Sequence, residues 1–180
     1  MMRAGVVGLG DMGSGLAKNL IKNGILTTGF DLSNLRMEAF VQMGGTPAAS
    51  IAEVGNNSDA VFVMVMNGEQ AKSVILGENG LASHMSKGGA VLLTATIKPV
   101  EAREIDTALQ GSGVHLIDSP VSGGFPGAQN GTLTMMAAAA PDVLDKYATI
   151  MGAVSSTIHR VGTHAGDGQV MKSCLQTLIG

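Results

Sequence analysis

The sequence predicts an α/β fold in which a doubly wound, mostly parallel sheet carries helices on both faces. Short apolar runs alternate with helical patterns along the 180 residues, which is typical of consecutive strand–helix–strand units. Residues 60–65 (Ala-Val-Phe-Val-Met-Val) are apolar without a break, as expected of a central parallel strand that is buried on both faces. A glycine-rich turn after the first apolar run is the third observation.

The first predicted unit is a strand, a glycine-rich turn, a helix and a second strand. Residues 4–7 form the first apolar run, residues 8–13 read Gly-Leu-Gly-Asp-Met-Gly, and a helical pattern leads to a second run at residues 25–30. In such a turn the first glycine allows a tight bend, the second lets the backbone approach a pyrophosphate, and the third lets the helix pack on the strand. The N–H groups at the helix start can then bind the phosphates. We therefore predict a Rossmann-type domain that binds a dinucleotide through Gly8, Leu9, Gly10, Asp11, Met12 and Gly13.

Asp31 ends the second strand, 18 residues after Gly13, where an acid can accept hydrogen bonds from an adenosine ribose. A carboxylate at this position would repel a 2′-phosphate, so NAD is favoured over NADP as the cofactor. Arg36 follows on the next helix. It is either a solvated arginine or a side chain that can turn toward a phosphate.

Each later apolar run predicts a strand and each pattern with a 3.6-residue period predicts a helix. Helix starts are marked by Ser33, by Ser50 with Glu53 in capping-box spacing, by the turn at residues 67–68, and by Pro99. We expect strands at residues 91–93, 114–118, 132–138 and 155–161, and helices at residues 34–43, 51–54, 99–109, 141–151 and from 166 to the end.

Polar, glycine-rich segments follow several of these strands, at residues 67–68, 94–96 and 119–124. Ligands of doubly wound sheets bind beyond the carboxyl ends of the strands, so these segments should converge with the glycine-rich turn on one crevice. We assign Met66, Asn67 and Thr96 to the cofactor side of that crevice.

Composition excludes several classes of protein. The net charge is −3 without a basic block, so a nucleic acid is not an expected partner, and no apolar stretch approaches the ~20 residues of a membrane span. The single cysteine, Cys174, excludes an internal disulfide framework and favours a reducing compartment. The first strand begins at once, which leaves no room for a signal peptide, and we expect a cytoplasmic protein. The four histidines lack ligand spacing, so no metal site is expected.

Lys172 is the main candidate for acid–base chemistry. It lies early in the last helix, with Gln169 three residues before it and Gln176 four after it, so the three should share one face with apolar neighbours. A lysine that is partly desolvated there has a lowered pKa and can transfer a proton, although a helix lysine taken alone is more often a solvated charge. The segment 122–124 (Ser-Gly-Gly) offers backbone N–H groups to a substrate carboxylate, or is an ordinary loop.

Four motifs in this order resemble the β-hydroxyacid dehydrogenase family, which includes 3-hydroxyisobutyrate dehydrogenases. They are residues 8–13, residues 118–124 (Asp-Ser-Pro-Val-Ser-Gly-Gly), residues 131–136 (Gly-Thr-Leu-Thr-Met-Met), and Gly166-x-Gly168-x-x-x-Lys172. The resemblance implies that Lys172 is the catalytic lysine, that Ser122, Gly123 and Gly124 contact the substrate, and that Thr96 lies in the cofactor site.

Two positions depart from the usual family pattern. Gln176 stands where the family often has asparagine, and residues 94–96 read Thr-Ala-Thr where Ser-Ser-Thr is usual. Gln176, like Asn67 followed by Gln70, Ala71 and Lys72, resembles the L-threonate dehydrogenase branch. A four-carbon sugar acid such as L-threonate is therefore expected as a substrate beside 3-hydroxyisobutyrate, with Gln176 as a substrate contact.

The resemblance also implies a division into domains. Residues 1–164 would form the NAD-binding domain, and residues 165–180 the start of an interdomain helix. That helix would lead to an all-helical C-terminal domain, absent from this chain, that completes the site and forms much of the dimer contact, so a homo-oligomer is expected for the full-length protein. The expected reaction is NAD-dependent oxidation of a small 3-hydroxy acid, with the lysine as acid and base. The alternatives are a non-catalytic dinucleotide-binding and oligomerisation module, and an NADPH-dependent reductase of short semialdehydes.

Overall fold

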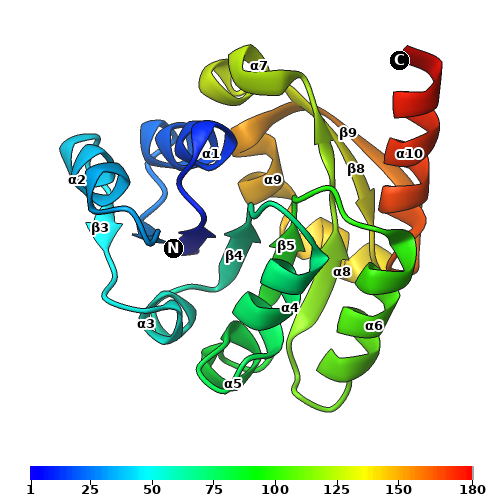
Figure 1. The fold of residues 1–180 in the computed structure, drawn as a ribbon, viewed down its shortest axis with the longest axis horizontal. Helices are drawn as coiled ribbons and strands as arrows, with labels where there is room; N and C mark the ends of the chain where they lie inside the picture. The colour runs from blue at the N-terminus through cyan, green and yellow to red at the C-terminus, as the bar shows by residue number, and fades with distance from the viewer. Residues whose placement is uncertain (180) are drawn as a thin grey trace.

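The computed structural model describes residues 1–179 and shows one mixed sheet between two layers of helices (Figure 1). The strands lie in the order β3-β2-β1-β4-β5-β6-β8-β7, and β9 pairs with β8. Their bounds are β1 Ala4–Val7, β2 Thr27–Phe30, β3 Thr46–Pro47, β4 Ala60–Val63, β5 Ala90–Leu93, β6 His115–Asp118, β7 Val121–Ser122, β8 Leu133–Ala138 and β9 Ser155–Gly162.

The first six strands are parallel, and the sheet turns antiparallel at β8. Asp118 of β6 lies opposite Ala138 of β8, and β7 continues alongside β8 with Val121 opposite Met135. β9 then runs parallel to β8. The predicted mostly parallel, doubly wound sheet is therefore confirmed, with an antiparallel step on one side.

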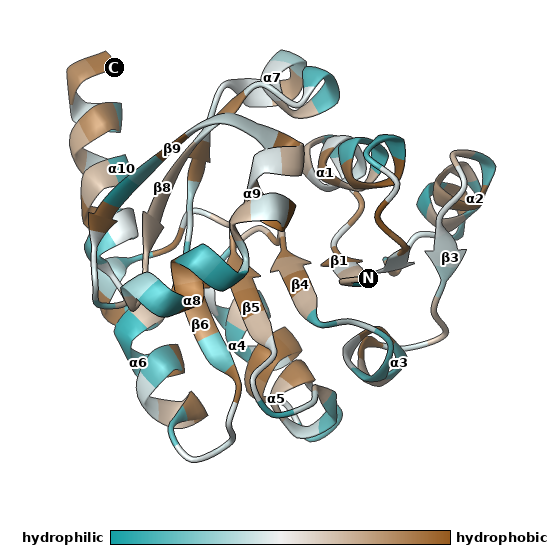
Figure 2. Ribbon diagram, turned by 180° about the vertical axis from the view of Figure 1, so that it is seen from behind, coloured by the Kyte–Doolittle hydropathy of each residue, from teal (hydrophilic) through white to brown (hydrophobic). Residues whose placement is uncertain are grey.

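Helices cover both faces of the sheet. Apolar side chains of α1, α2, α7, α8 and α9 form one core cluster with the sheet, and those of α3, α4, α5 and α6 form the other. Figure 1 shows α4–α6 in front of the sheet, and Figure 2, seen from behind, shows α8 and α9 in front of it. The bounds are α1 Asp11–Lys22, α2 Asn34–Gln42, α3 Ile51–Asn56, α4 Gly68–Leu76, α5 Leu81–His84, α6 Pro99–Leu109, α7 Gly124–Asn130, α8 Pro141–Lys146, α9 Ala148–Val154 and α10 Asp167–Ile179.

Side chains before three helices cap them, as their residue types predict. The Ser33, Ser50 and Asn67 side chains accept hydrogen bonds from backbone N–H groups in the first turns of α2, α3 and α4. Pro99 opens α6, also as predicted. Glu53 does not close a full capping box, because its carboxylate accepts from the Ala49 N–H at 2.7 Å.

Three expectations about elements were incomplete. The helix expected at residues 141–151 is two helices, because the chain breaks at Tyr147, whose buried side chain donates its hydroxyl to the Gly88 carbonyl at 2.6 Å. The run at residues 60–65 leaves the sheet after Val63. The short strand β7 and the helix α7 form around residues 122–124, where no strand or helix was predicted. Among the described helices, none combines the length and apolarity that crossing a membrane requires.

Candidate active site at the carboxyl edge of the sheet

The sequence-predicted site residues lie at the carboxyl edge of the parallel strands. Residues 8–13 follow β1, Met66 and Asn67 follow β4, and Thr96 follows β5. The segment from β6 through β7 leads to residues 122–124. This edge is where doubly wound sheets bind their ligands, and Figure 1 shows α1 and α7 beside it.

The three glycines of the first turn meet different surroundings. Gly8 has φ +91°, and a Cβ there would overlap the Met64 carbonyl oxygen. A Cβ at Gly13 would overlap the Gly8 carbonyl oxygen, so both positions need glycine for the turn and the helix to fit. Next to Gly10 the nearest atoms belong to the Arg36 guanidinium, 3.8 Å from the position that a Cβ would take. A Cβ at Gly10 would therefore meet only the end of the flexible Arg36 side chain, at van der Waals distance.

The N-terminus of α1 has no side-chain cap and follows the glycine-rich turn, so a phosphate fits there. Its N-cap is Gly10, which has no side chain to accept from the first-turn N–H groups. At α2, α3 and α4 a serine or asparagine side chain occupies that place. Because uncapped N–H groups and the helix dipole both favour an anion, the residues around Gly10 fit the pyrophosphate of a dinucleotide.

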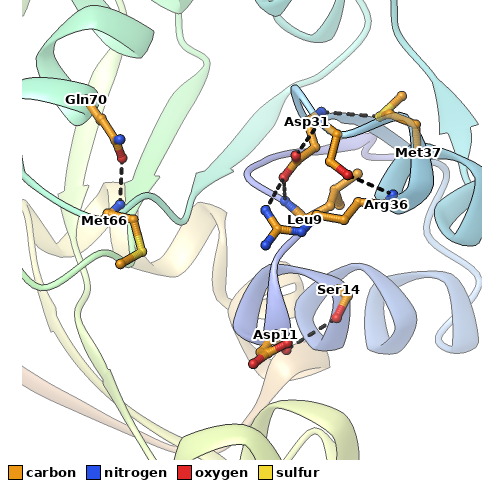
Figure 3. A network of polar contacts seen from close by, with 9 residues as sticks. Leu9, Asp11, Ser14, Asp31, Arg36, Met37, Met66 and Gln70 are labelled. Carbon is orange, nitrogen blue, oxygen red and sulfur yellow. Dashed lines mark hydrogen bonds and ion pairs between the residues drawn. The ribbon is translucent and has the colours of Figure 1, made fainter.

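Asp31 ties the end of β2 to the glycine-rich turn (Figure 3). Its carboxylate accepts from the Leu9 N–H at 2.7 Å, the Ser33 N–H at 2.8 Å and the Arg36 guanidinium at 3.4 Å, and its side chain is 8 % exposed. A carboxylate has about four acceptor sites, so one remains for a further donor such as a ribose hydroxyl. A cavity of about 280 Å³ adjoins this network, lined by Leu9, Gly10, Asp11, Ser14, Leu35, Arg36, Ala39, Phe40 and Met43.

Met66, Asn67 and Thr96 stand further along the same edge. The Met66 side chain is 84 % exposed, while its backbone N–H donates to Gln70. Asn67 is occupied as the cap of α4. Thr96 is exposed between buried neighbours, whereas Thr94 is buried and donates its hydroxyl to the Val63 carbonyl. Of these side chains, Met66 and Thr96 are thus open to a ligand.

The segment 122–124 is shaped by glycine and held by α1. Gly123 has φ +129° and Gly124 φ +59°, conformations that other residues rarely adopt. The buried Asn19 of α1 donates to the Ala128 carbonyl of α7 at 2.7 Å, and Gly15 leaves no room for a side chain against Ala128. The structure therefore fixes this segment relative to the first helix.

Lys172 lies on α10, and its surroundings differ from those of its two glutamine neighbours. Lys172 is partly buried, and burial lowers the pKa of its ammonium group. Gln169 is fully buried against the strand ends, and Gln176 is exposed. The three residues are spaced along one helix face, as expected, but their burial differs: Gln169 points into the protein, and α10 then rises past the sheet (Figure 1).

Two residues that the sequence reasoning did not assign to the site prove central to its geometry. Asp118 is a fully buried carboxylate at the end of β6, and Gln169 is bonded to it at 2.9 Å. The sequence did hint at Asp118, because an acid at the end of a buried strand needs hydrogen-bond partners.

Away from this edge, a second cavity of about 360 Å³ includes Asp106, His115 and His164 in its lining. No group of three metal-ligating side chains occurs within residues 1–179.

Comparisons with known proteins show what the chain is similar to. The family pattern described as the NAD binding domain of 6-phosphogluconate dehydrogenase matches residues 3–162. An L-threonate dehydrogenase of Escherichia coli O6:H1 is 37 % identical over 177 residues, and an NAD-dependent L-serine dehydrogenase of Pseudomonas aeruginosa is 35 % identical over 179. These alignments cover 98 % and 99 % of this chain, and 59 % and 60 % of the two relatives.

A solved structure gives the same result for the fold. The crystal structure of 3-hydroxyisobutyrate dehydrogenase from Salmonella typhimurium superposes with a TM-score of 0.93 and 32 % identity, over 99 % of this chain and 62 % of that one. The chain thus spans about three fifths of the length of these relatives. It carries an NAD(P)-binding domain and belongs to the β-hydroxyacid dehydrogenase family.

Proposed function

We propose that the full-length protein oxidises a small 3-hydroxy acid with NAD, and that the acid is either a four-carbon sugar acid, such as L-threonate, or 3-hydroxyisobutyrate. The observation that carries this proposal is Lys172, a partly buried lysine with a lowered pKa on a helix anchored at the same edge as the open N-terminus of α1. A lysine that can lose its proton, beside a dinucleotide site, is suited to acid–base chemistry at a hydroxyl group.

The cofactor would lie along the edge with its pyrophosphate over Gly10. Residues 8–13 would bind the phosphates through backbone N–H groups, and Asp31 would accept from the adenosine ribose. Met66, Asn67 and Thr96 would flank the nicotinamide half. When bound, NAD supplies the acceptor for the hydride that leaves the alcohol carbon.

The substrate would lie between Lys172 and the segment 122–124. In the oxidising direction the neutral Lys172 amine takes the hydroxyl proton, and in the reverse direction its ammonium returns a proton to the carbonyl oxygen. Ser122 and the backbone N–H groups of Gly123 and Gly124 would hold the carboxylate. Gln176 would bind the reacting oxygen or a neighbouring hydroxyl.

NAD is proposed as the preferred cofactor because Asp31 places a negative charge where NADP carries its 2′-phosphate. One observation favours a second candidate. The Arg36 guanidinium is 3.4 Å from Asp31 and half exposed, so it can neutralise that charge and contact a phosphate. An NADPH-dependent reduction of short semialdehydes is therefore the second candidate function.

The division into domains is also part of the proposal. Residues 1–164 would be the NAD-binding domain and residues 165–180 the start of an interdomain helix, followed by an all-helical domain in a homo-oligomer. The exposed apolar side chains of α10 support this, since contiguous apolar surface usually marks a contact. They are Val170 at 43 %, Met171 at 44 %, Leu178 at 84 % and Ile179 at 73 % exposure.

The test uses the full-length protein with NAD and then NADP, against L-threonate, 3-hydroxyisobutyrate and L-serine, followed by the absorbance of the reduced cofactor. We expect turnover with NAD, and a fall in kcat of about 10²–10⁴ for Lys172→Ala, the usual scale for a general acid–base group. Lys22→Ala, an exposed lysine at the end of α1, is the matched control. Cofactor binding without turnover of any of these acids would instead favour the non-catalytic module, and full kcat in Lys172→Ala would remove the lysine mechanism.

A further inference from the structure

Two fully buried polar side chains, Asp118 and Gln169, join the start of α10 to the ends of two strands. The Gln169 amide nitrogen donates to Asp118 Oδ1 at 2.9 Å, and the other carboxylate oxygen accepts from the backbone N–H groups of Gly166 at 2.8 Å and Gln169 at 3.2 Å. Both side chains have 0 % exposure. Asp118 therefore binds the first turn of α10 through three hydrogen bonds from outside the helix.

The same Gln169 amide also binds the segment that follows β5. Its nitrogen donates to the Ala95 carbonyl at 3.1 Å, and its oxygen accepts from the Ile97 N–H at 3.0 Å. Both amide hydrogens and the amide oxygen are thus used, and the Ile97 donor and the Asp118 acceptor fix which way the amide points. Glutamine alone among the natural side chains offers this donor–acceptor set at this length.

Two glycines let the backbone of α10 come close enough for these bonds. A Cβ at Gly168 would lie 2.7 Å from the Met136 carbonyl oxygen and 2.8 Å from that of Asp118. Gly166 has φ +95°, and a Cβ there would lie 3.0 Å from the Pro99 carbonyl oxygen. The start of the helix is therefore seated against β6, β8 and α6 with little freedom to shift.

The network meets the proposed site at three places. Ala95 and Ile97 are the neighbours of Thr96 on either side, and Asp118 begins the segment that leads to Ser122. Lys172 stands one helical turn after Gln169, on the adjacent part of the same helix. One pair of side chains thus links the backbone beside Thr96, the strand before Ser122 and the helix that carries Lys172.

We propose that Gln169 and Asp118 are positioning residues, which set the height and rotation of α10 and so place the Lys172 amine against the cofactor edge. The proposal rests on the proposed function for the role of Lys172, but the placement itself is a property of the fold. Directional hydrogen bonds suit this task better than apolar contacts, because they fix the helix in one register. A shift of about 1 Å in a catalytic group costs roughly 10²-fold in rate.

The experiment is a double-mutant cycle in the full-length protein with Gln169→Glu, Asp118→Asn and the combined exchange. Gln169→Glu places a second carboxyl group at hydrogen-bond distance from the Asp118 carboxylate and removes the donor to the Ala95 carbonyl. Asp118→Asn turns an acceptor into a donor that faces the Gln169 amide. The combined exchange restores a donor–acceptor pair between the two side chains at the native charge. Gln42→Glu, the same exchange on the exposed surface of α2, is the control.

Three quantities are measured for each variant: kcat, the Kd of NADH, and the pH dependence of Lys172 acylation by acetic anhydride, followed by mass spectrometry. We expect either single exchange to lower kcat by roughly 10²-fold and to change the NADH Kd by a smaller factor, because the network holds the backbone beside Thr96 but lies apart from residues 8–13, which would hold the pyrophosphate. The Lys172 labelling profile should shift in Gln169→Glu and return toward the native profile in the combined variant. A loss of stability alone would lower kcat and weaken NADH binding together, instead of lowering kcat by the larger factor.

The outcomes separate this inference from the proposed function. Native kcat and native Lys172 labelling in Gln169→Glu, or a combined variant no better than the worse single one, would overturn the positioning role. If the native protein oxidises none of the acids, the proposed function fails, and the labelling profiles still decide whether Gln169 and Asp118 place Lys172. If a single variant does not fold, the combined exchange decides, because a restored bond between the two side chains should recover folding and shift Lys172 labelling toward the native profile, although the Ala95 carbonyl still lacks its donor.

Discussion

Alanine substitution of the three glycines in the first turn should separate folding from cofactor binding. Gly10 has φ −67° and ψ −163°, which alanine adopts, and the nearest atom to an added Cβ is 3.8 Å away. Alanine is a poorer N-cap than glycine by about 0.5–1 kcal/mol, and it recovers about 0.4–1 kcal/mol by restricting the unfolded chain. Gly10→Ala should therefore leave the free energy of unfolding nearly unchanged.

The cofactor affinity of Gly10→Ala should nevertheless fall. The added methyl group lies beside the first-turn N–H groups of α1, so a pyrophosphate can no longer approach them closely. Each hydrogen bond to a charged group contributes about 1.5–3 kcal/mol, so the loss of one such bond weakens NADH binding roughly tenfold to a hundredfold. Gly8→Ala and Gly13→Ala should instead destabilise the fold by about 2–5 kcal/mol, through strain and overlap with backbone oxygens.

The assay pairs urea unfolding with NADH titration followed by the fluorescence of the reduced nicotinamide, and the chain has no tryptophan to interfere. The expected pattern is native stability with weakened binding for Gly10→Ala, and lost stability for the other two. Native NADH affinity in a folded Gly10→Ala protein would refute the placement of the pyrophosphate at the start of α1. If Gly10→Ala lost as much free energy of unfolding as Gly8→Ala does, the claim that position 10 accommodates a Cβ would be refuted.

Three further substitutions test other parts of the site. Asp31→Asn should raise the affinity for NADPH relative to NADH about tenfold when both cofactors are titrated. Repulsion between the Asp31 carboxylate and a 2′-phosphate ~6 Å away amounts to about 1.4 kcal/mol at an effective dielectric constant of ~40. Adding Arg36→Ala to this variant should reverse the gain. Burial lowers the pKa of Lys172, and oxidation needs the neutral amine. The kcat/KM for oxidation should therefore rise with pH through a pKa below the ordinary 10.5. The pH profile of Lys172→Arg should lack that rise. Asn19→Ala should destabilise the protein by about 1–3 kcal/mol in urea, since it leaves the Ala128 carbonyl without its buried donor, while Asn130→Ala on the exposed end of α7 should change little.

The parts of the fold that the sequence predicted are those with a local cause. Val61 and Phe62 belong to an apolar run that only a buried strand explains, and Ser33 and Asn67 cap helices through their own side chains. The glycine-rich turn was predictable for the same reason, because the backbone at Gly8 takes a conformation that favours glycine.

The parts that were missed have distant causes. α7 contains three glycines or prolines in seven residues and shows no helical period, and Asn19 and Gly15, more than a hundred residues earlier, hold it against α1. The break between α8 and α9 falls at Tyr147, whose buried side chain is bonded to Gly88, 59 residues away, a contact that local sequence does not reveal. The sequence placed Gln169 on the helix face of Lys172 without any partner, and only the packed structure brings Asp118 and Ile97 to its amide.

The buried charge of Asp118 argues that its network serves position more than stability. Burial raises the pKa of Asp118, although hydrogen bonds from Gln169 and Gly166 oppose that rise. The pKa of Asp118 is thus higher in the folded chain than in the unfolded chain. Stability then falls as the pH rises from the unfolded pKa to the folded pKa, so ionised Asp118 lowers the free energy of unfolding at neutral pH. Buried charges are for this reason weak evidence of stabilisation. What the carboxylate does supply is two oxygens aimed at the N-terminus of α10, where the helix dipole favours a negative charge and where Lys172 is about one and a half turns away. Asp118 lowers stability and fixes the direction of α10, and the placement of Lys172 on that helix best explains why a carboxylate is buried there.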